Sequence, residues 1–229
     1  QRTPSSTIFT GGEKMNALNW MSLIPDETNI KNINIPGAHD ASTQFCQLGL
    51  FSSCQDLSIK EMLKIGVRAF DLRVNGENMV HSFTKCKKSH FGKPLTVFDV
   101  MADIADFLKS NPTETVLVFY KNDGKISGQD CLDLLKEKII NKGKSIWYLD
   151  NKFPCLNEVR GKIILLNRID GSAGIDFSKM PYQGGAKAPV VQFFSPNGED
   201  MAAVQDWYSL PRKRKWLEAV EPLLKDERS

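Results

Sequence analysis

The chain has 229 residues, of which 25% are charged and 41% hydrophobic, and its formal net charge is +3. This composition is ordinary for a globular protein, and the length suits one sizeable core or two small ones. The small net charge gives no argument for a nucleic-acid partner, and no segment approaches the roughly 18–20 apolar residues of a membrane-spanning helix. We expect residues 1–17 to be a polar leader and residues 18–229 to form one domain.

Predicted strands and helices alternate along the chain. Strands are expected at residues 34–37, 67–74, 79–82, 115–121, 162–167, 189–194 and 203–207. Helices are expected after the caps Ser58 and Thr96, at residues 127–141 and at residues 211–225. Strand–helix alternation predicts a parallel sheet with helices outside it.

The strand ends distinguish between the two main parallel architectures, which are a barrel and an open doubly wound sheet. No glycine-rich phosphate fingerprint follows the first strand, which argues against an open nucleotide-binding sheet. Polar, chemically capable residues end or follow nearly every predicted strand: His39, Arg73, His81, Lys121, Arg168 and Asp206. Barrel enzymes build their sites at that face. We therefore predict an α/β fold of the TIM-type (β/α) barrel class, incomplete in this chain because only about six strands can be placed before its end.

The predicted second strand carries two charges on one face. With a period of two, Phe70 and Leu72 face one way, and Asp71 and Arg73 face the other. A buried charge needs a partner, so Asp71 and Arg73 need each other or an anionic ligand. A purely structural ion pair is the alternative interpretation.

Two of the three histidines lie at predicted strand ends. His39 follows the first strand, and His81 ends the short third one. Two imidazoles and an arginine suit phosphoryl transfer without a metal: one imidazole takes a proton, the other gives one, and the arginine stabilises the phosphate. His90 lies in a basic loop and is interpreted as a surface residue.

The five cysteines show no CxxC spacing, which argues against a zinc site. Cys46, Cys54 and Cys86 fall in predicted loops. A disulfide in an oxidising compartment and free thiols both remain open.

Six segments, in order, resemble the X region of the bacterial phosphatidylinositol-specific phospholipases C. They are residues 35–43 (IPGAHDAST), 66–73 (GVRAFDLR), 80–82 (VHS), 111–116 (NPTETV), 161–168 (GKIILLNR) and 204–208 (VQDWY). The resemblance implies a secreted enzyme that cleaves phosphatidylinositol to diacylglycerol and inositol 1,2-cyclic phosphate. It also implies that the substrate, phosphatidylinositol or a GPI-anchored lipid, is met at a membrane surface, and that no cofactor is used.

The resemblance implies four catalytic roles. His39 is the general base acting on the inositol 2-hydroxyl, and His81 is the general acid that protonates the diacylglycerol oxygen. Arg73 binds the phosphate, and Asp40 supports the acid side of the site. Calcium-dependent eukaryotic relatives have carboxylates where this chain has Arg73, so the resemblance implies no metal here.

Four further residues are implied to bind the inositol ring. Lys121, Arg168 and Asp206 would hydrogen-bond the ring hydroxyls, and Tyr208 would stack on the ring. The alternatives for these residues are solvation of strand ends and core packing.

The chain departs from the family pattern at two places. Ser82 stands where the family usually has a glycine. The family's base histidine is supported by an aspartate on a late strand, and no such residue is assigned here. We expect about 60–90 further residues after Ser229 to supply it, together with the missing strands, by comparison with a barrel norm of roughly 250 residues.

Two other functions remain open. One is a metal-dependent phosphodiesterase of related barrel fold, which needs a carboxylate cluster. The other is a non-catalytic inositol-phosphate or membrane-binding module. For peripheral membrane contact, the candidate loops are the one containing Phe51 and residues 83–91, which include Lys85, Lys87 and Lys88.

Overall fold

The computed structural model of the chain describes residues 16–47, 53–181, 191–209 and 211–221. Most of the expected leader (1–15), Phe51 and the end of the expected last helix (222–225) lie outside these ranges.

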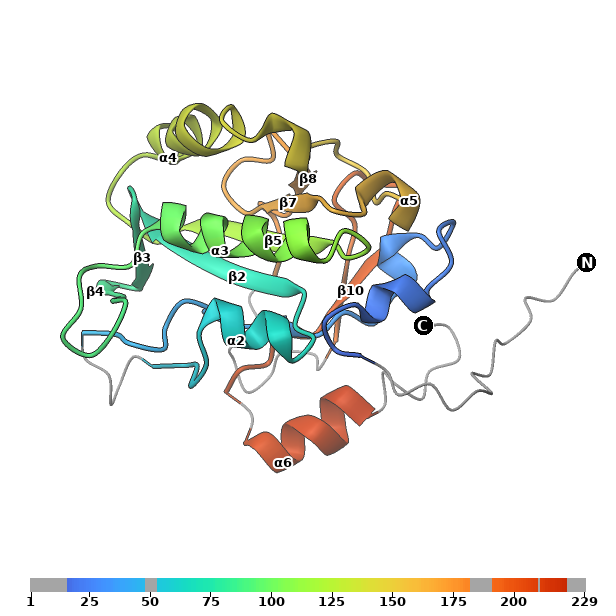
Figure 1. The fold of residues 1–229 in the computed structure, drawn as a ribbon, viewed down its shortest axis with the longest axis horizontal. Helices are drawn as coiled ribbons and strands as arrows, with labels where there is room; N and C mark the ends of the chain where they lie inside the picture. The colour runs from blue at the N-terminus through green and yellow to red at the C-terminus, as the bar shows by residue number, and fades with distance from the viewer. Residues whose placement is uncertain (1–15, 48–52, 182–190, 210, 222–229) are drawn as a thin grey trace, which may run out of the picture.

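One sheet of eight strands forms the centre of the fold (Figure 1). Its main order is β4 (Thr84–Lys85), β3 (Asn78–His81), β2 (Ala69–Asn75), β5 (Val116–Asn122), β7 (Ile163–Asn167) and β6 (Trp147–Tyr148). In addition, β1 (Gly37–Ala38) pairs with β2, and β8 (Ile175–Asp176) pairs with β7. The pairings β1–β2, β2–β5, β5–β7, β6–β7 and β7–β8 are parallel, as predicted, whereas β3 and β4 extend the edge in antiparallel fashion.

The last two strands differ from the prediction. β9 (Gln192–Phe194) and β10 (Ala202–Val204) were expected as strands of the parallel sheet, but they pair antiparallel with each other in a separate sheet. The connection, residues 195–201, is too short for a parallel crossover, which needs a dozen or more residues. Asn197 Oδ1 accepts hydrogen bonds from the backbone of Glu199 and Asp200 and so stabilises a turn there. Over the described residues the strands do not close into a barrel, which agrees with the prediction of an incomplete TIM-type barrel.

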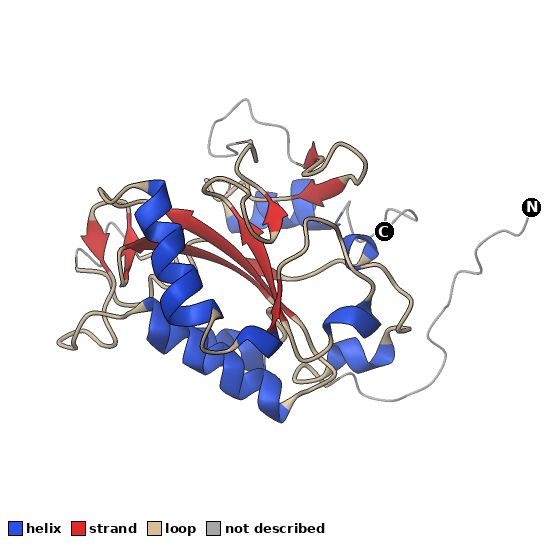
Figure 2. Cartoon of the chain, turned by 90° about the horizontal axis from the view of Figure 1, so that it is seen from above, coloured by secondary structure: helices blue, strands red, loops and turns tan. Residues whose placement is uncertain are grey.

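Helices lie along the outer face of the sheet (Figure 2). They are α2 (Ile59–Lys64), α3 (Val97–Ser110) and α4 (Gly128–Leu135), the last continued by a π-helical turn at Lys136–Ile140. The predicted caps are confirmed, because Ser58 and Thr96 each form a reciprocal capping box with the residue three positions later. Shorter elements are α5 (Leu156–Val159), α6 (Arg212–Lys215), a π-helical turn at Trp216–Val220 and 3₁₀ turns at Trp20–Leu23, Ile30–Asn32 and Lys144–Ile146.

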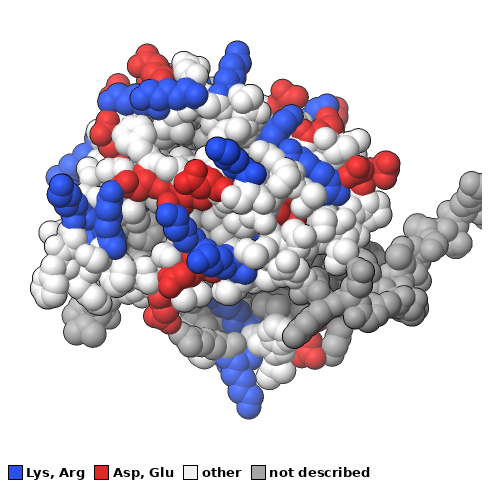
Figure 3. Space-filling model, viewed as in Figure 1, with Lys and Arg blue, Asp and Glu red and all other residues white. Residues whose placement is uncertain are grey.

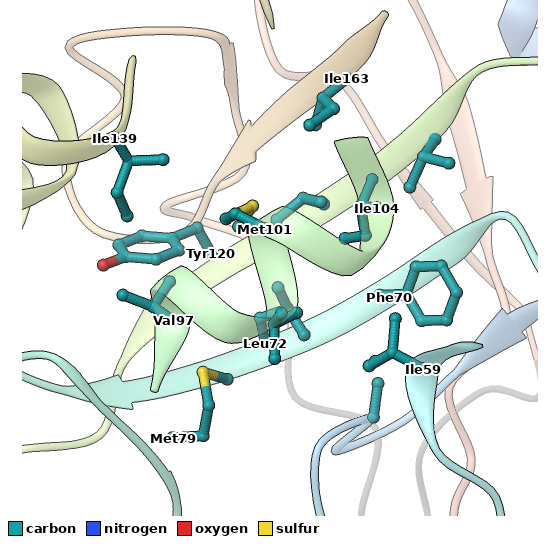
Figure 4. Close-up of a cluster of buried hydrophobic side chains, with 14 of the residues drawn as sticks. Ile59, Phe70, Leu72, Met79, Val97, Met101, Ile104, Tyr120, Ile139 and Ile163 are labelled. Atoms are coloured by element: carbon teal, nitrogen blue, oxygen red, sulfur yellow. The ribbon is translucent and has the colours of Figure 1, made fainter. Parts of the chain in front are cut away.

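Alternation along β2 separates two cores. Phe70 and Leu72 are fully buried toward the helices, where Figure 4 shows them near Ile104 of α3. The opposite face of the sheet packs a second cluster that includes Leu117 and Phe177. Asp71 and Arg73 lie on this second face beyond the apolar cluster, so β2 supports the outer core with one set of side chains and the site with the other, as its period of two predicted.

A buried ion pair fixes the opposite end of β2. Arg68 and Glu114 have no exposed side-chain surface, and Arg68 Nη2 lies 2.9 Å from Glu114 Oε2. Arg68 also donates to the carbonyls of Ala17 and Leu18, while Glu114 accepts from the backbone N–H of Met21. The pair therefore ties the N-terminal segment under the sheet, far from the strand ends that carry the site.

Candidate active site

The carboxyl ends of the strands bring the predicted site residues together. His39 follows β1, Arg73 lies near the end of β2, His81 ends β3, Lys121 lies near the end of β5, Arg168 follows β7, and Asp206 follows β10. The parallel strands β1, β2, β5 and β7 present their carboxyl ends at one edge. The antiparallel strand β3 and the segment after β10 bring His81 and Asp206 to the same place.

His39 is held by a hydrogen bond at one ring nitrogen and by stacking on one ring face. Its Nδ1 lies 2.8 Å from Asp206 Oδ1, and its ring stacks on Tyr208 with centroids 4.2 Å apart and planes 22° from parallel. The side chain of Gln55 donates to the His39 carbonyl over 2.6 Å. The expectation that this chain lacks a carboxylate for His39 is wrong. Asp206 was assigned only to the substrate, because nothing in the local sequence indicates which distant residue the segment after β10 will contact.

Asp40 lies between the other catalytic candidates. Its Oδ1 is 2.7 Å from Arg73 Nε, and its Oδ2 is 3.1 Å from His81 Nε2 and 3.3 Å from His39 Nε2. The carboxylate is fully buried, and the backbone of Asp40 is left-handed, with φ of 46°. A non-glycine residue in this conformation is uncommon, and such strain clusters at functional sites.

Arg73 is surrounded by three carboxylates. Besides Asp40, its guanidinium contacts Asp71 Oδ2 at 3.0 Å and Asp123 Oδ2 at 3.4 Å. Of the two alternatives for Asp71 and Arg73, the structure shows the pairing with each other. Asp123 was missed, although a period of two along β5 places it on the same face as Lys121.

The two remaining cations join the same network. Lys121 Nζ lies 2.5 Å from Asp123 Oδ1, and Arg168 Nη1 lies 3.4 Å from Asp71 Oδ1. All eight residues that the sequence singled out are thus linked, directly or through one carboxylate, in a single polar cluster.

The model of the phosphatidylinositol-specific phospholipase C X domain matches residues 37–169, which is more than half of the chain. The chain belongs to this family.

Two bacterial members of the X-domain family are similar over most of the chain. One is 1-phosphatidylinositol phosphodiesterase of Listeria monocytogenes, 30% identical over 215 residues, with 88% of this chain and 62% of the relative covered. The other is the Staphylococcus aureus protein of the same name, 29% identical over 225 residues, with 90% of this chain and 69% of the relative covered. The chain therefore spans less than two thirds of the length of the Listeria relative.

A solved structure supports the fold of the X-domain family. A structure of S. aureus phosphatidylinositol-specific phospholipase C, described as concerning modulation of its membrane binding, matches with a TM-score of 0.68 and 25% identity. The match covers 91% of this chain and 72% of that chain.

The residue after His81 has a backbone that explains the family's usual glycine. Ser82 has φ of 53°, in the left-handed region that glycine adopts without steric cost. Ser82 adopts this conformation despite its steric cost, and the His81 side chain still reaches Asp40.

Neighbouring charges and hydrogen bonds shift the pKa values of two residues in the X-domain site. Burial lowers the pKa of His39, but hydrogen bonds to Asp206 and Asp40 outweigh it and raise that pKa from 6.5 to about 9. Burial raises the pKa of Asp71, but Arg73 and Arg168 outweigh it, so this pKa lies below its ordinary value. These shifts favour the ionised carboxylate of Asp71 and the cationic ring of His39.

Two groups of potential metal ligands lie in the described site. They are His39 with Asp40 and Asp71, and Asp40 with Cys54 and His81, each with ligand atoms within 4.8 Å of one another. The guanidinium of Arg73 already pairs with both carboxylates of the first group. Arg73 thus already neutralises the two carboxylates of the first group.

A cavity of about 400 Å³ borders the site at His39 and Tyr208. Cys54, Gln55 and Leu57 line another side of it, whereas Arg73, His81, Lys121 and Arg168 do not line it. It is therefore adjacent to the polar cluster and not the space between the two histidines.

Proposed function

We propose that this chain cleaves phosphatidylinositol to diacylglycerol and inositol 1,2-cyclic phosphate without a metal. The observation that carries the proposal is the convergence of two imidazoles and a guanidinium on one carboxylate. His39 Nε2 and His81 Nε2 lie 3.3 and 3.1 Å from Asp40 Oδ2, and Arg73 Nη2 lies 3.3 Å from His39 Nε2. The proposal assigns His39 as the base, His81 as the acid and Arg73 as the phosphate-binding cation.

The first half of the reaction uses His39. Asp206 accepts a hydrogen bond from the Nδ1–H of His39, which leaves Nε2 as the basic nitrogen. Neutral His39 takes the proton of the inositol 2-hydroxyl, and the resulting oxygen attacks the phosphorus. Arg73 stabilises the negative charge that spreads over the phosphate oxygens.

The second half uses His81. The bond between phosphorus and the diacylglycerol oxygen breaks, and protonated His81 donates its proton to that oxygen. Asp40 accepts a hydrogen bond from the protonated ring and balances its charge. The products are diacylglycerol and the five-membered cyclic phosphate, and no water is consumed.

We assign ring binding to the outer members of the cluster. Lys121 and Arg168 carry donors that suit inositol hydroxyls, and both are held by carboxylates at the strand ends. Asp206 and Tyr208 orient His39 in the structure, and we propose that they also meet the inositol ring.

Substrate in a bilayer requires contact with a membrane surface, and the expected loop offers apolar groups for it. Phe83 is 87% exposed and Phe91 fully exposed, on either side of Lys85. The face shown in Figure 3 mixes both signs of charge, so we propose that insertion of these rings contributes more than long-range attraction. Among the described residues no helix has the length and apolarity needed to cross a membrane. We propose a secreted protein that binds membranes peripherally.

The decisive experiment follows phosphatidylinositol turnover by ³¹P NMR in the presence of EDTA. The proposal expects the cyclic phosphate as first product, and it expects His81→Ala to abolish its appearance. Binding of phosphatidylinositol vesicles without turnover would instead indicate a non-catalytic module. Turnover only with added divalent ions would indicate a metal-dependent phosphodiesterase.

A further inference from the structure

Cys46 and Cys86 lie opposite each other where two site-bearing segments meet. They form an isolated antiparallel bridge between the segment that follows Asp40 and the segment that follows β4. The backbone bonds Lys87 N to Phe45 O (2.7 Å) and Gln47 N to Lys85 O (3.1 Å) flank the bridge. Cys46 and Cys86 are therefore a non-hydrogen-bonded pair, whose Cα atoms lie about 4.5 Å apart in such bridges. That spacing lies within the range of disulfides.

The two sulfurs already touch. Cys46 Sγ lies 3.4 Å from Cys86 Sγ, and both residues are buried. The other described cysteines have different neighbours. Cys54 is exposed with its sulfur 3.9 Å from Asp40 Oδ2, and Cys131 Sγ lies 3.9 Å from the Tyr120 hydroxyl.

We propose that Cys46 and Cys86 form a disulfide when the folded protein meets a disulfide oxidant such as oxidised glutathione. The Cys46 thiolate attacks one sulfur of the oxidant, forms a mixed disulfide and releases one thiol. The Cys86 thiolate then attacks the Cys46 sulfur and releases the second thiol. The protein loses two electrons and two protons, and the oxidant becomes two thiols.

Cys46 is suited to the first attack. It retains 9% exposure whereas Cys86 has none. The hydrogen bond from the Cys86 thiol lowers the pKa of Cys46, which increases the fraction of the reactive thiolate.

The disulfide would fasten the two halves of the acid–base site. Asp40 precedes Cys46 by six residues, and His81 lies in the hairpin that leads to Cys86. The bond closes a loop between residues 40 positions apart, which restricts the unfolded chain. It also resists separation of Asp40 from His81. The pairing does not depend on the proposed reaction.

The test counts thiols after equilibrating purified protein with oxidised glutathione. We expect three titratable thiols of the five in the unfolded, unreduced chain, and a cross-linked peptide pair that contains Cys46 and Cys86. Cys46→Ser should abolish the cross-link, and the matched control Cys54→Ser should retain it. Reduction should lower the Tm of wild type by on the order of 10 °C and leave that of Cys46→Ser unchanged.

Two results would overturn the proposal. One is five titratable thiols after oxidation. The other is a cross-link that joins Cys54 to either partner and disappears in Cys54→Ser.

Discussion

His39 Nδ1 lies 2.8 Å from Asp206 Oδ1, although the two residues are 167 positions apart in the chain. A carboxylate in this position fixes the tautomer of an imidazole base and stabilises its protonated form. The contact connects the residue that follows β1 to the segment that follows β10 in the separate two-stranded sheet. It gives the site a titration that can be measured.

Asp206→Asn should move the acid limb of the pH–rate profile. In wild type the limb should rise toward about pH 9, because His39 must lose its proton before it can act as base. Without the carboxylate the pKa of His39 falls, so the limb should move to lower pH, while the maximal rate drops by about 10²–10⁴-fold because the tautomer is no longer fixed. Profiles of kcat/KM against pH measure both. Asp200→Asn, in the turn before β10 and paired with Lys31, is the control. An unshifted limb in Asp206→Asn would contradict the assignment.

The same contact should make stability depend on pH. The folded-state pKa of His39 is raised, so its contribution is fully present below about pH 6.5 and is lost as pH rises through about 9. Denaturant unfolding should therefore show a larger cost of Asp206→Asn at pH 6 than at pH 10. An equal cost at both values would show that the charge of His39 is not involved.

Removing either proposed catalytic imidazole should lower turnover by at least about 10²-fold, the low end for a general acid or base. We expect His39→Ala and His81→Ala to keep the far-ultraviolet circular dichroism of wild type, since neither side chain belongs to an apolar cluster. His90→Ala is the matched control, because the His90 side chain is exposed and packs edge-on against the Phe45 ring. All three variants are assayed on a water-soluble phosphatidylinositol, so that membrane binding by residues 83–91 does not affect the rate. A wild-type rate in either of the first two variants would remove that histidine from the mechanism.

Chelators should leave the rate unchanged. Arg73 supplies a positive charge beside Asp40 and Asp71, so no divalent ion is needed there. Turnover in EDTA and turnover with added calcium should agree within error. The turnover of Arg73→Lys should fall well below that of wild type, because an ammonium group lacks the planar guanidinium donors that contact several oxygens at once. Activity that is lost in EDTA and restored by calcium would refute this role.

Membrane binding should depend on exposed rings. Phe83→Ala with Phe91→Ala should weaken binding to phosphatidylinositol vesicles by about 10-fold or more, since each ring buries a large apolar area on insertion. Charge reversal at Lys85, Lys87 and Lys88 should weaken binding further at low salt and less at high salt. Sedimentation with vesicles measures both, with Phe193→Ala, another exposed ring, as control. Unchanged binding in the ring and charge variants would exclude this loop.

Breaking the ion pair under the sheet should destabilise the fold without altering the pH profile. Glu114→Gln leaves Arg68 buried without its counter-charge, which typically costs about 3–5 kcal/mol. Replacing both residues, as in Arg68→Met with Glu114→Leu, should recover part of that loss. Urea unfolding of the three proteins checks the order, and a single variant as stable as wild type would contradict it.

Local chemistry explains what the sequence could predict. The caps Ser58 and Thr96, the alternation of Asp71 and Arg73 in β2, and the polar residues at strand ends all follow from rules that act over a few residues. Such rules located six of the eight predicted site residues at strand ends, whereas Asp40 and Tyr208 came from the resemblance to the X region.

Long-range partners explain what it could not. The contact between Asp206 and His39 depends on how a late segment folds back, and no periodicity encodes this. β9 and β10 pair antiparallel because the turn between them is short. The sequence shows how short this turn is, but it does not show that the two strands pair with each other. The choice of Cys46 and Cys86 among three loop cysteines likewise depends on a backbone bridge between distant segments.

The two faces of β2 limit how this protein can vary. Phe70 and Leu72 pack against the helices, whereas Asp71 and Arg73 lie on the face that carries the candidate site. The strand pairs with β5 residue by residue from Ala69 to Val74. A single insertion or deletion inside this strand would exchange the two sets, placing charges among helices and aromatic rings in the site. Substrate preference can therefore change more easily through substitutions in the loops beyond the strands than through changes in β2. A change in β2 affects the stability of the fold and the geometry of the site at the same time.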